Sequence, residues 1–160
     1  PTDMVRALPK VKKNSNVSLY YTRPDHLKEV SDAIDKPDYF KAYTLCVTLY
    51  ESYGKEILVS QFKGNPSLAQ DITDKLSVSA TIDLLHKHGM IDKGVRSQML
   101  SVNDTRNDFA HRYFSQISPE LENRLKDNTL KIMKTLETVK GIYDKLDKEE
   151  VDKVYFHKKL

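Results

Sequence analysis

Apolar residues recur at steps of three and four along most of this chain, and only 5 of its 160 residues are glycine. This spacing places the apolar side chains on one face of a helix, whereas a half-buried strand would alternate apolar and polar residues. The pattern is strongest from residue 38 to about residue 62, where it comprises Phe40, Tyr43, Val47, Tyr50 and Ile57. The spacing therefore predicts an all-α fold in which this segment is the central helix.

Proline, glycine and capping residues mark where other helices start and stop. Pro24 suits the first turn of a short helix, and Pro37 ends it. Ser67 is the expected N-cap of the element after the central helix. The apolar spacing of this segment predicts a helix that runs to His88, and Gly89 is its C-terminal stop.

Two further start signals lie in the second half of the chain. Asp92 can cap a helix over about residues 93–114, and Ser118-Pro119-Glu120 combines a cap, a first-turn proline and an early acid. One long helix is expected to follow, and its apolar row comprises Leu125, Ile132, Val139 and Leu146. That row is a packing seam for other helices or for a second subunit.

The first part of the chain is less regular. Residues 1–16 carry lysines and little apolar content, which indicates a solvated arm, and residues 17–21 are a short β-prone run. We therefore divide the chain into residues 1–36, an arm with a short helix, and residues 37–160, a helical domain.

Composition limits the classes of function that the chain can have. Hydrophobic residues make up 39% of it, and 26 basic against 23 acidic residues leave a formal net charge of +3. That balance does not by itself indicate a nucleic-acid binder, so any electrostatic site must be local. No uncharged apolar run is long enough to indicate a transmembrane helix or a signal peptide.

Cysteine and histidine usage gives two further expectations. The single cysteine, Cys46, lies in an apolar run, which fits a buried, inert thiol in a reducing compartment, so we expect a cytoplasmic protein. The five histidines include no pair with zinc-ligand spacing backed by cysteines. We therefore expect neither a metal nor a cofactor.

The segment Arg106-Asn107-Asp108-Phe109-Ala110-His111 carries the most chemistry in the chain. It brings a guanidinium, an amide and an imidazole onto adjoining faces of about one and a half helical turns. Asn107 and His111 lie one turn apart, where their side chains can hydrogen-bond. A guanidinium matches a phosphate and histidine titrates near neutral pH, so the trio can grip a phosphate and move a proton beside it.

The same residues admit simpler interpretations. Arg106 lies at the border of an apolar and a polar face and needs a partner, which is either a structural carboxylate or a ligand phosphate. Asp104, Asp108 and Arg112 can form an exposed charge ladder, which is a solvated face rather than a metal site. An arginine and a histidine five residues apart also occur on many helix surfaces.

In this setting the chain resembles the HEPN superfamily. The resemblance lies in an arginine, an asparagine, three residues and a histidine on a late helix, which follows a helix and the turn Gly89-Met90-Ile91. It covers roughly residues 38–143, and the order of its parts is similar to that of mannitol-operon-repressor-like HEPN relatives. It implies an antiparallel bundle of four to five main helices with an irregular N-terminal segment.

Many HEPN proteins are metal-independent ribonucleases, some of them toxins or defence effectors. By resemblance, the active-site residues here would be Arg106, Asn107 and His111. Two subunits commonly pair so that their motifs face each other across a two-fold axis. The resemblance thus implies a homodimer, an RNA substrate, attack by the ribose 2′-hydroxyl and a cyclic phosphate product.

Three neighbours of the trio, Tyr113, Arg112 and Asn103, are candidates for substrate contact or modification. In some toxin members a tyrosine two residues after the histidine is modified by a partner nucleotidyltransferase, so such an antitoxin is an implied partner. The repressor-like branch often keeps the fold without evident nuclease activity. Three hypotheses therefore stay open: a ribonuclease, a non-catalytic dimeric regulatory or binding module, and a surface network without function.

Overall fold

The computed structural model describes residues 25–62, 64–112 and 118–157, with side chains described as far as residue 146. Within these ranges the chain forms helices and the turns between them, which confirms the all-α prediction. The helices are α1 (His26–Asp35), α2 (Tyr39–Ser60), α3 (Pro66–Thr73), α4 (Val78–Lys87), α5 (Lys93–Arg112), α6 (Pro119–Asp127) and α7 (Thr129–His157).

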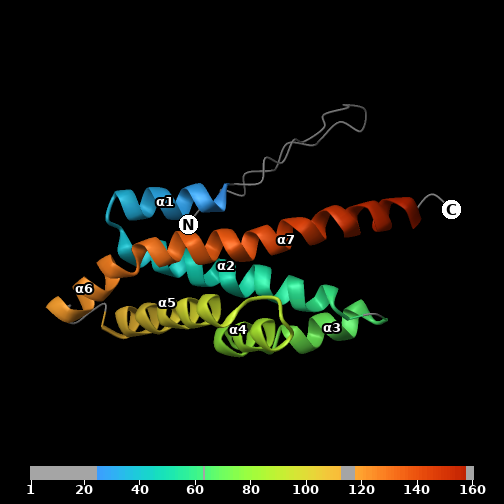
Figure 1. Cartoon of the computed structure of the whole chain (residues 1–160), viewed down its shortest axis with the longest axis horizontal. Coiled ribbons are helices and arrows are strands. Elements are labelled where there is room, and N and C mark those ends of the chain that lie inside the picture. Colours follow the sequence, from blue (N-terminus) through green and yellow to red (C-terminus); the bar gives the residue numbers. More distant parts are fainter. Residues whose placement is uncertain (1–24, 63, 113–117, 158–160) are drawn as a thin grey trace, which may run out of the picture.

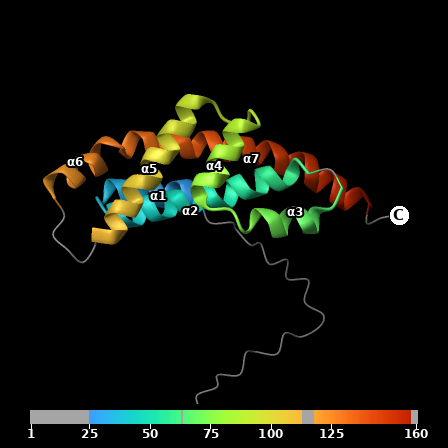
Figure 2. The same ribbon diagram turned by 90° about the horizontal axis from the view of Figure 1, so that it is seen from below.

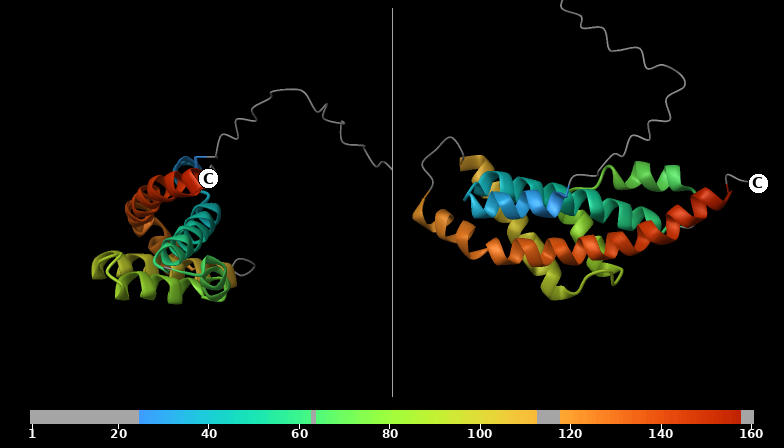
Figure 3. Two further views of the ribbon diagram at one scale, coloured as in Figure 1. Left: turned by 90° about the vertical axis from the view of Figure 1, so that its right-hand side faces the viewer. Right: turned by 90° about the horizontal axis from the view of Figure 1, so that it is seen from above.

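Helix α2 lies at the centre of the bundle and contacts α1, α3, α4, α5 and α7 (Figure 1). Figure 3 shows α1 and α7 on one side of α2, and α3, α4 and α5 on the other. Helix α1 runs against α2 and α7 runs in the same direction as α2 (Figure 1), whereas α5 crosses α2 obliquely (Figure 2). Figure 2 shows α3 far from the end where α5 and α6 meet, so these two regions lie at opposite ends of the molecule.

Two buried tyrosines of α2 fix its register against α6 and α7. The Tyr43 hydroxyl donates to the Leu125 carbonyl oxygen at 2.7 Å, and the Tyr50 hydroxyl is hydrogen-bonded to the Thr135 hydroxyl. Because burial keeps a phenolate away from water, it raises the pKa of both tyrosines. These two bonds therefore align the first half of α2 in parallel with residues 125–135, which form the end of α6 and the start of α7.

The apolar stripe predicted for α2 is confirmed along most of its length. Tyr43, Val47, Tyr50 and Ile57 are buried, whereas Phe40, in the first turn, keeps 37% of its surface exposed. Cys46 is buried as predicted, and burial raises the pKa of its thiol to about 12. The central position of this helix therefore follows from its sequence.

The prediction for the segment after α2 is partly wrong, because residues 66–87 form two helices. Asn65 caps α3 in place of Ser67, since Pro66 takes the first helical position and the Asn65 Oδ1 atom accepts from the Leu68 N–H at 3.0 Å. Ser77 then caps α4, which is the helix predicted to run to His88.

The long C-terminal helix is also divided. It starts as predicted, because the Ser118 Oγ atom accepts from the Leu121 N–H at 3.2 Å. It is interrupted at Asn128, whose side-chain amide donates to the Thr105 hydroxyl of α5 at 3.3 Å. Leu125, Ile132 and Val139 of the predicted row are buried against other helices of the same chain. This part of the packing seam therefore contacts the bundle and not a second subunit.

Helix α1 matches the short helix predicted between Pro24 and Pro37, and its Val30 is fully buried against the rest of the bundle. The division of the chain into residues 1–36 and 37–160 stays a prediction. The predicted arm of residues 1–16 and the run of residues 17–21 lie outside the described residues. In the part of the chain that the structure describes, no helix has the length and apolar character needed to cross a membrane.

Candidate functional site on helix α5

The turn after α4 sets the direction of α5. Gly89 has a φ of 73°, a left-handed conformation that favours glycine, and the Met90 N–H donates to the Leu85 carbonyl at 2.8 Å. The Asp92 Oδ1 atom then accepts from the Val95 N–H at 2.8 Å, which confirms the predicted cap. The buried face of α5 comprises Met99, Val102, Asn103, Thr105 and Phe109.

Arg106 lies on the inward half of α5 and is partly buried. Its Nη2 atom donates to the Asn103 Oδ1 atom at 3.3 Å, and the Asn103 side-chain amide donates to the Ser79 hydroxyl of α4 at 3.3 Å. The Arg106 Nε atom is buried and finds no acceptor among the described residues. In the described part of the chain this guanidinium is thus held by one long bond to a neutral amide and by no carboxylate.

Asn107 and His111 occupy the outward side of the same helix. His111 is exposed in the last turn of α5, and Asn107, one turn earlier, is partly exposed. In the described part of the chain no hydrogen bond joins these two side chains, so the amide does not orient the imidazole in this conformation. The imidazole is therefore open to any molecule that meets this face of the helix.

The angular spacing explains why the trio does not converge within one chain. At about 100° per residue, Asn107 and His111 are separated by roughly 40° around the helix axis, whereas Arg106 and His111 are separated by roughly 140°. The long arginine side chain can bend toward the outward face, but the imidazole cannot reach the inward one. Within one chain, Arg106 and His111 therefore face different sides of α5.

A polar network that the sequence did not reveal borders the trio. The Arg124 Nη1 atom of α6 binds the Asp108 carboxylate at 2.7 Å, and its Nη2 atom donates to the Thr105 hydroxyl at 3.3 Å. Asp108 therefore belongs to an interhelical ion pair, which the predicted charge ladder along α5 did not include. Thr105 was the residue that could have indicated this network from the sequence, because a hydroxyl that is fully buried on the apolar face of a helix needs polar partners.

The three neighbouring candidates fall in different settings. Asn103 is 3% exposed, so it can influence a substrate only through Arg106. Arg112 is exposed at the end of α5, where a cation is favoured by the helix dipole. Tyr113, and with it the predicted modification site, lies outside the described residues.

A hollow of about 460 Å³ lies where α2 begins and α5 ends. Phe40 and Phe109 meet there edge to face, with ring centres 5.6 Å apart, and Asp38 and Glu122 also line it. Lys41 lines it as well, so two carboxylates outnumber one ammonium, and the hollow is not a phosphate site that extends the chemistry of Arg106.

Among the described residues, no group of three histidine, cysteine, aspartate or glutamate side chains is placed to hold a metal ion. The chain matches no protein-family model, no curated protein and no solved structure. The resemblance to HEPN proteins therefore depends on the motif of Arg106, Asn107 and His111 and on the order of the parts over roughly residues 38–143.

Proposed function

We propose that the chain is a metal-independent endoribonuclease of the HEPN type that acts as a homodimer. The observation that carries this proposal is that Arg106 has no carboxylate partner among the described residues. Two other arginines, one in the first turn of α5 and one in α6, are each paired with a carboxylate: Arg96 with Asp83, and Arg124 with Asp108, both at 2.7 Å. The best bond of Arg106 goes to a neutral amide oxygen at 3.3 Å, which leaves its planar fork available to a phosphate.

The outward imidazole of His111 supplies the proton transfers. In the proposed reaction the ribose 2′-hydroxyl attacks phosphorus, the O2′–P bond forms and the P–O5′ bond breaks. One His111 takes the proton of the 2′-hydroxyl, and His111 of the second subunit gives a proton to the leaving O5′ atom. The products are a 2′,3′-cyclic phosphate and a 5′-hydroxyl, and the need for a 2′-hydroxyl restricts the substrate to RNA.

Two facing copies of α5 would complete the arrangement that one copy lacks. Across a two-fold axis the two His111 rings flank the scissile linkage, and the two Arg106 side chains hold the negative charge that develops on phosphorus. In such a dimer Asn107, one turn before the imidazole, would contact the same phosphate or the facing histidine. An antitoxin or nucleotidyltransferase acting on Tyr113, and a cytoplasmic location, remain part of this proposal.

The test is cleavage of labelled RNA in the presence of excess EDTA. His111→Ala should lower the rate by roughly 10²–10⁴-fold, because it removes the general acid and the general base together. His26→Ala, a histidine change on α1, is the matched control and should keep the wild-type rate. Equal cleavage by wild type and His111→Ala would show that the nuclease activity does not come from this site.

Subunit mixing tests the shared site. If both His111 rings serve one linkage, equal amounts of wild-type and His111→Ala subunits, exchanged to equilibrium, should retain about a quarter of the activity, since only wild-type homodimers are complete. About half of the activity would remain if each subunit acted alone, and that result would remove the two-fold site from the proposal.

A non-catalytic dimeric regulatory or binding module is the second candidate. The observation that favours it is the chain of bonds from Ser79 through Asn103 to Arg106, which holds the guanidinium toward the bundle. In this candidate Arg106 and His111 brace the dimer interface or hold a ligand. This candidate predicts no RNA turnover and a marked loss of dimerisation in Arg106→Ala, which size-exclusion chromatography would detect.

A further inference from the structure

A second feature lies at the opposite end of the molecule from the C-terminus of α5, where α2 ends and α3 and α4 pack beside it (Figure 1). A pocket of about 340 Å³ opens there. Its apolar lining comprises Leu58, Phe62, Ile72, Leu76 and Leu84. Leu58 is 5% exposed and forms the floor, whereas Phe62 and Ile72 are 50% and 46% exposed and form walls.

The pocket exists because α3 packs on α2 through small residues. Ala69 and Thr73 are the buried residues of α3, and the Thr73 hydroxyl is bound to the Ala69 carbonyl oxygen at 3.0 Å. The larger Leu68 and Ile72 are therefore left half exposed at the side of the helix. Since the one hydroxyl in the lining is already bonded to its own helix, the interior of the pocket is apolar.

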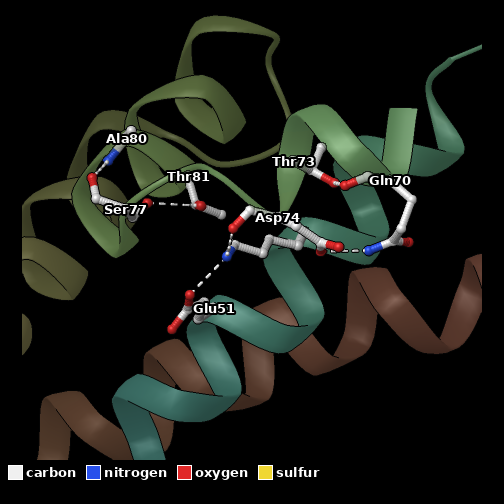
Figure 4. A network of polar contacts seen from close by, with 8 residues as sticks. Glu51, Gln70, Thr73, Asp74, Ser77, Ala80 and Thr81 are labelled. Atoms are coloured by element: carbon white, nitrogen blue, oxygen red, sulfur yellow. Dashed lines mark hydrogen bonds and ion pairs between the residues drawn. The ribbon is translucent and has the colours of Figure 1, made fainter. Parts of the chain in front are cut away.

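Polar contacts hold α3 in this position without any ligand. The Lys55 ammonium of α2 binds the Glu51 carboxylate at 2.7 Å and the Asp74 carbonyl oxygen, at the end of α3, at 3.3 Å. Figure 4 shows Glu51 and Asp74 on the two sides of this contact, with Gln70 bonded to the Asp74 side chain. The walls of the pocket are thus pre-formed, as they are in most small-molecule sites.

The volume defines the size of the occupant. An apolar cavity of ~150 Å³ holds one benzene ring, so 340 Å³ has room for two fused rings or an alkyl-aryl group of about ten to twelve carbon atoms. The value also lies within the ~300–1,000 Å³ range of ligand sites. A single side chain from a partner protein would leave much of this space unfilled.

The rim defines the polar end of the occupant. Gln61, the C-cap of α2, and His88, the C-cap of α4, both line the pocket. A helix C-terminus carries partial negative charge. Helix α2 has no basic residue in its last turn to offset this charge, whereas α4 has His86 and Lys87 in its last turn, so the uncompensated end at the rim is that of α2. The exposed Phe62 ring adds an aromatic face that attracts a cation. A donating, positively charged head group is therefore preferred over a carboxylate.

We propose that this pocket binds an apolar amine of two-ring size, with its hydrocarbon part over Leu58 and its ammonium at the end of α2, beside the Phe62 ring. The site is remote from Arg106 and His111, and the proposal does not depend on the nuclease function. It assigns a ligand-binding role to the junction of α2, α3 and α4.

The test compares three probes that share one ring system: 1-naphthylmethylamine, 1-naphthylmethanol and 1-naphthoate. Titrations of the full chain, followed by NMR, should give saturable binding in the order amine, alcohol, carboxylate. Each step in that order should weaken binding by about two- to fivefold, the size of a surface helix-dipole interaction. A carboxylate that binds best, or the absence of saturable binding by all three, would overturn the proposal.

Two variants and a control locate the binding. Ile72→Trp fills the pocket and Phe62→Ala removes one wall, and each should weaken amine binding by at least about tenfold. Leu68→Trp makes the same kind of change on the same helix outside the pocket, where Leu68 is 55% exposed, and should leave binding unchanged. All three sites are half exposed, so the variants should keep the wild-type helical content. Binding that persists unchanged in both pocket variants would refute the site.

Discussion

The close approach of α2 and α4 gives a prediction in which two glycine-to-alanine changes have opposite signs. A Cβ atom added at Gly54 would lie 2.8 Å from the Thr81 Cγ2 atom and 3.2 Å from the Leu85 Cδ1 atom. At Gly141, in α7, an added Cβ would meet nothing within 4 Å. Both positions are helical, so any difference between the two variants reports the contact with α4.

The magnitude follows from two opposing terms. Alanine in place of a helical glycine stabilises by about 1 kcal/mol, and this term applies to both variants. At Gly54 the contact adds an overpacking cost of about 1–3 kcal/mol. The Thr81 side chain cannot easily move away from an added methyl group, because it is fully buried and β-branched and its hydroxyl donates to the Ser77 carbonyl at 2.9 Å (Figure 4). Gly141→Ala should therefore stabilise, and Gly54→Ala should destabilise by up to about 2 kcal/mol.

Thermal unfolding followed by circular dichroism measures both effects. For a chain of this size each kcal/mol moves the melting temperature by roughly 2–4 °C. Adding Thr81→Ser to Gly54→Ala removes the crowded methyl group, keeps the hydroxyl and should restore part of the loss, which a double-mutant cycle would quantify. A melting temperature that rises as much in Gly54→Ala as in Gly141→Ala would show that α2 and α4 are not in close contact there.

Three further predictions test the core, a cap and a buried bond. Burial raises the pKa of the Cys46 thiol from 9.0 to about 12. The free energy of unfolding should therefore be unaffected by this thiol below pH 9 and should fall between pH 9 and about 12, because there the thiol ionises in the unfolded chain but not in the folded one. Urea titrations over this range should show the decline, which Cys46→Ala should reduce. Asn65→Ala removes the N-cap of α3 and should cost about 1 kcal/mol in the same assay, whereas Ser67→Ala should cost little. Tyr43→Phe leaves the Leu125 carbonyl without its 2.7 Å donor and should cost about 1–3 kcal/mol, and a neutral result would mean that another donor replaces it.

The sequence predicted the parts of the fold that depend on neighbouring residues. Asp92, Ser118 and Gly89 act within four or five positions of their partners, so their roles could be recognised without a structure. The stripe on α2 was equally visible, because a helix buried on most sides repeats its apolar residues over many turns.

The features that the sequence did not predict depend on distant partners. Asn128 interrupts the C-terminal helix and donates to Thr105, a residue 23 positions earlier, without any glycine or proline between α6 and α7. The same holds for the candidate site. Helical spacing located Arg106 at the border of two faces, but only the tertiary structure showed that its bond goes to Asn103, and that Ser79 holds Asn103 in place.

The role of Arg106 can be decided by stability as well as by activity. Its buried Nε atom has no acceptor among the described residues, an arrangement that costs about 1–3 kcal/mol in the folded chain. If the guanidinium serves a ligand, Arg106→Met keeps the length of the side chain, removes this cost and leaves the melting temperature equal or higher. Arg124→Met is the control and should destabilise by up to about 1 kcal/mol, because it breaks the exposed pair with Asp108. If Arg106→Met lowers the melting temperature at constant protein concentration more than Arg124→Met does, the guanidinium stabilises the fold or the dimer. The non-catalytic dimeric regulatory or binding module would then explain Arg106 better than the ribonuclease does.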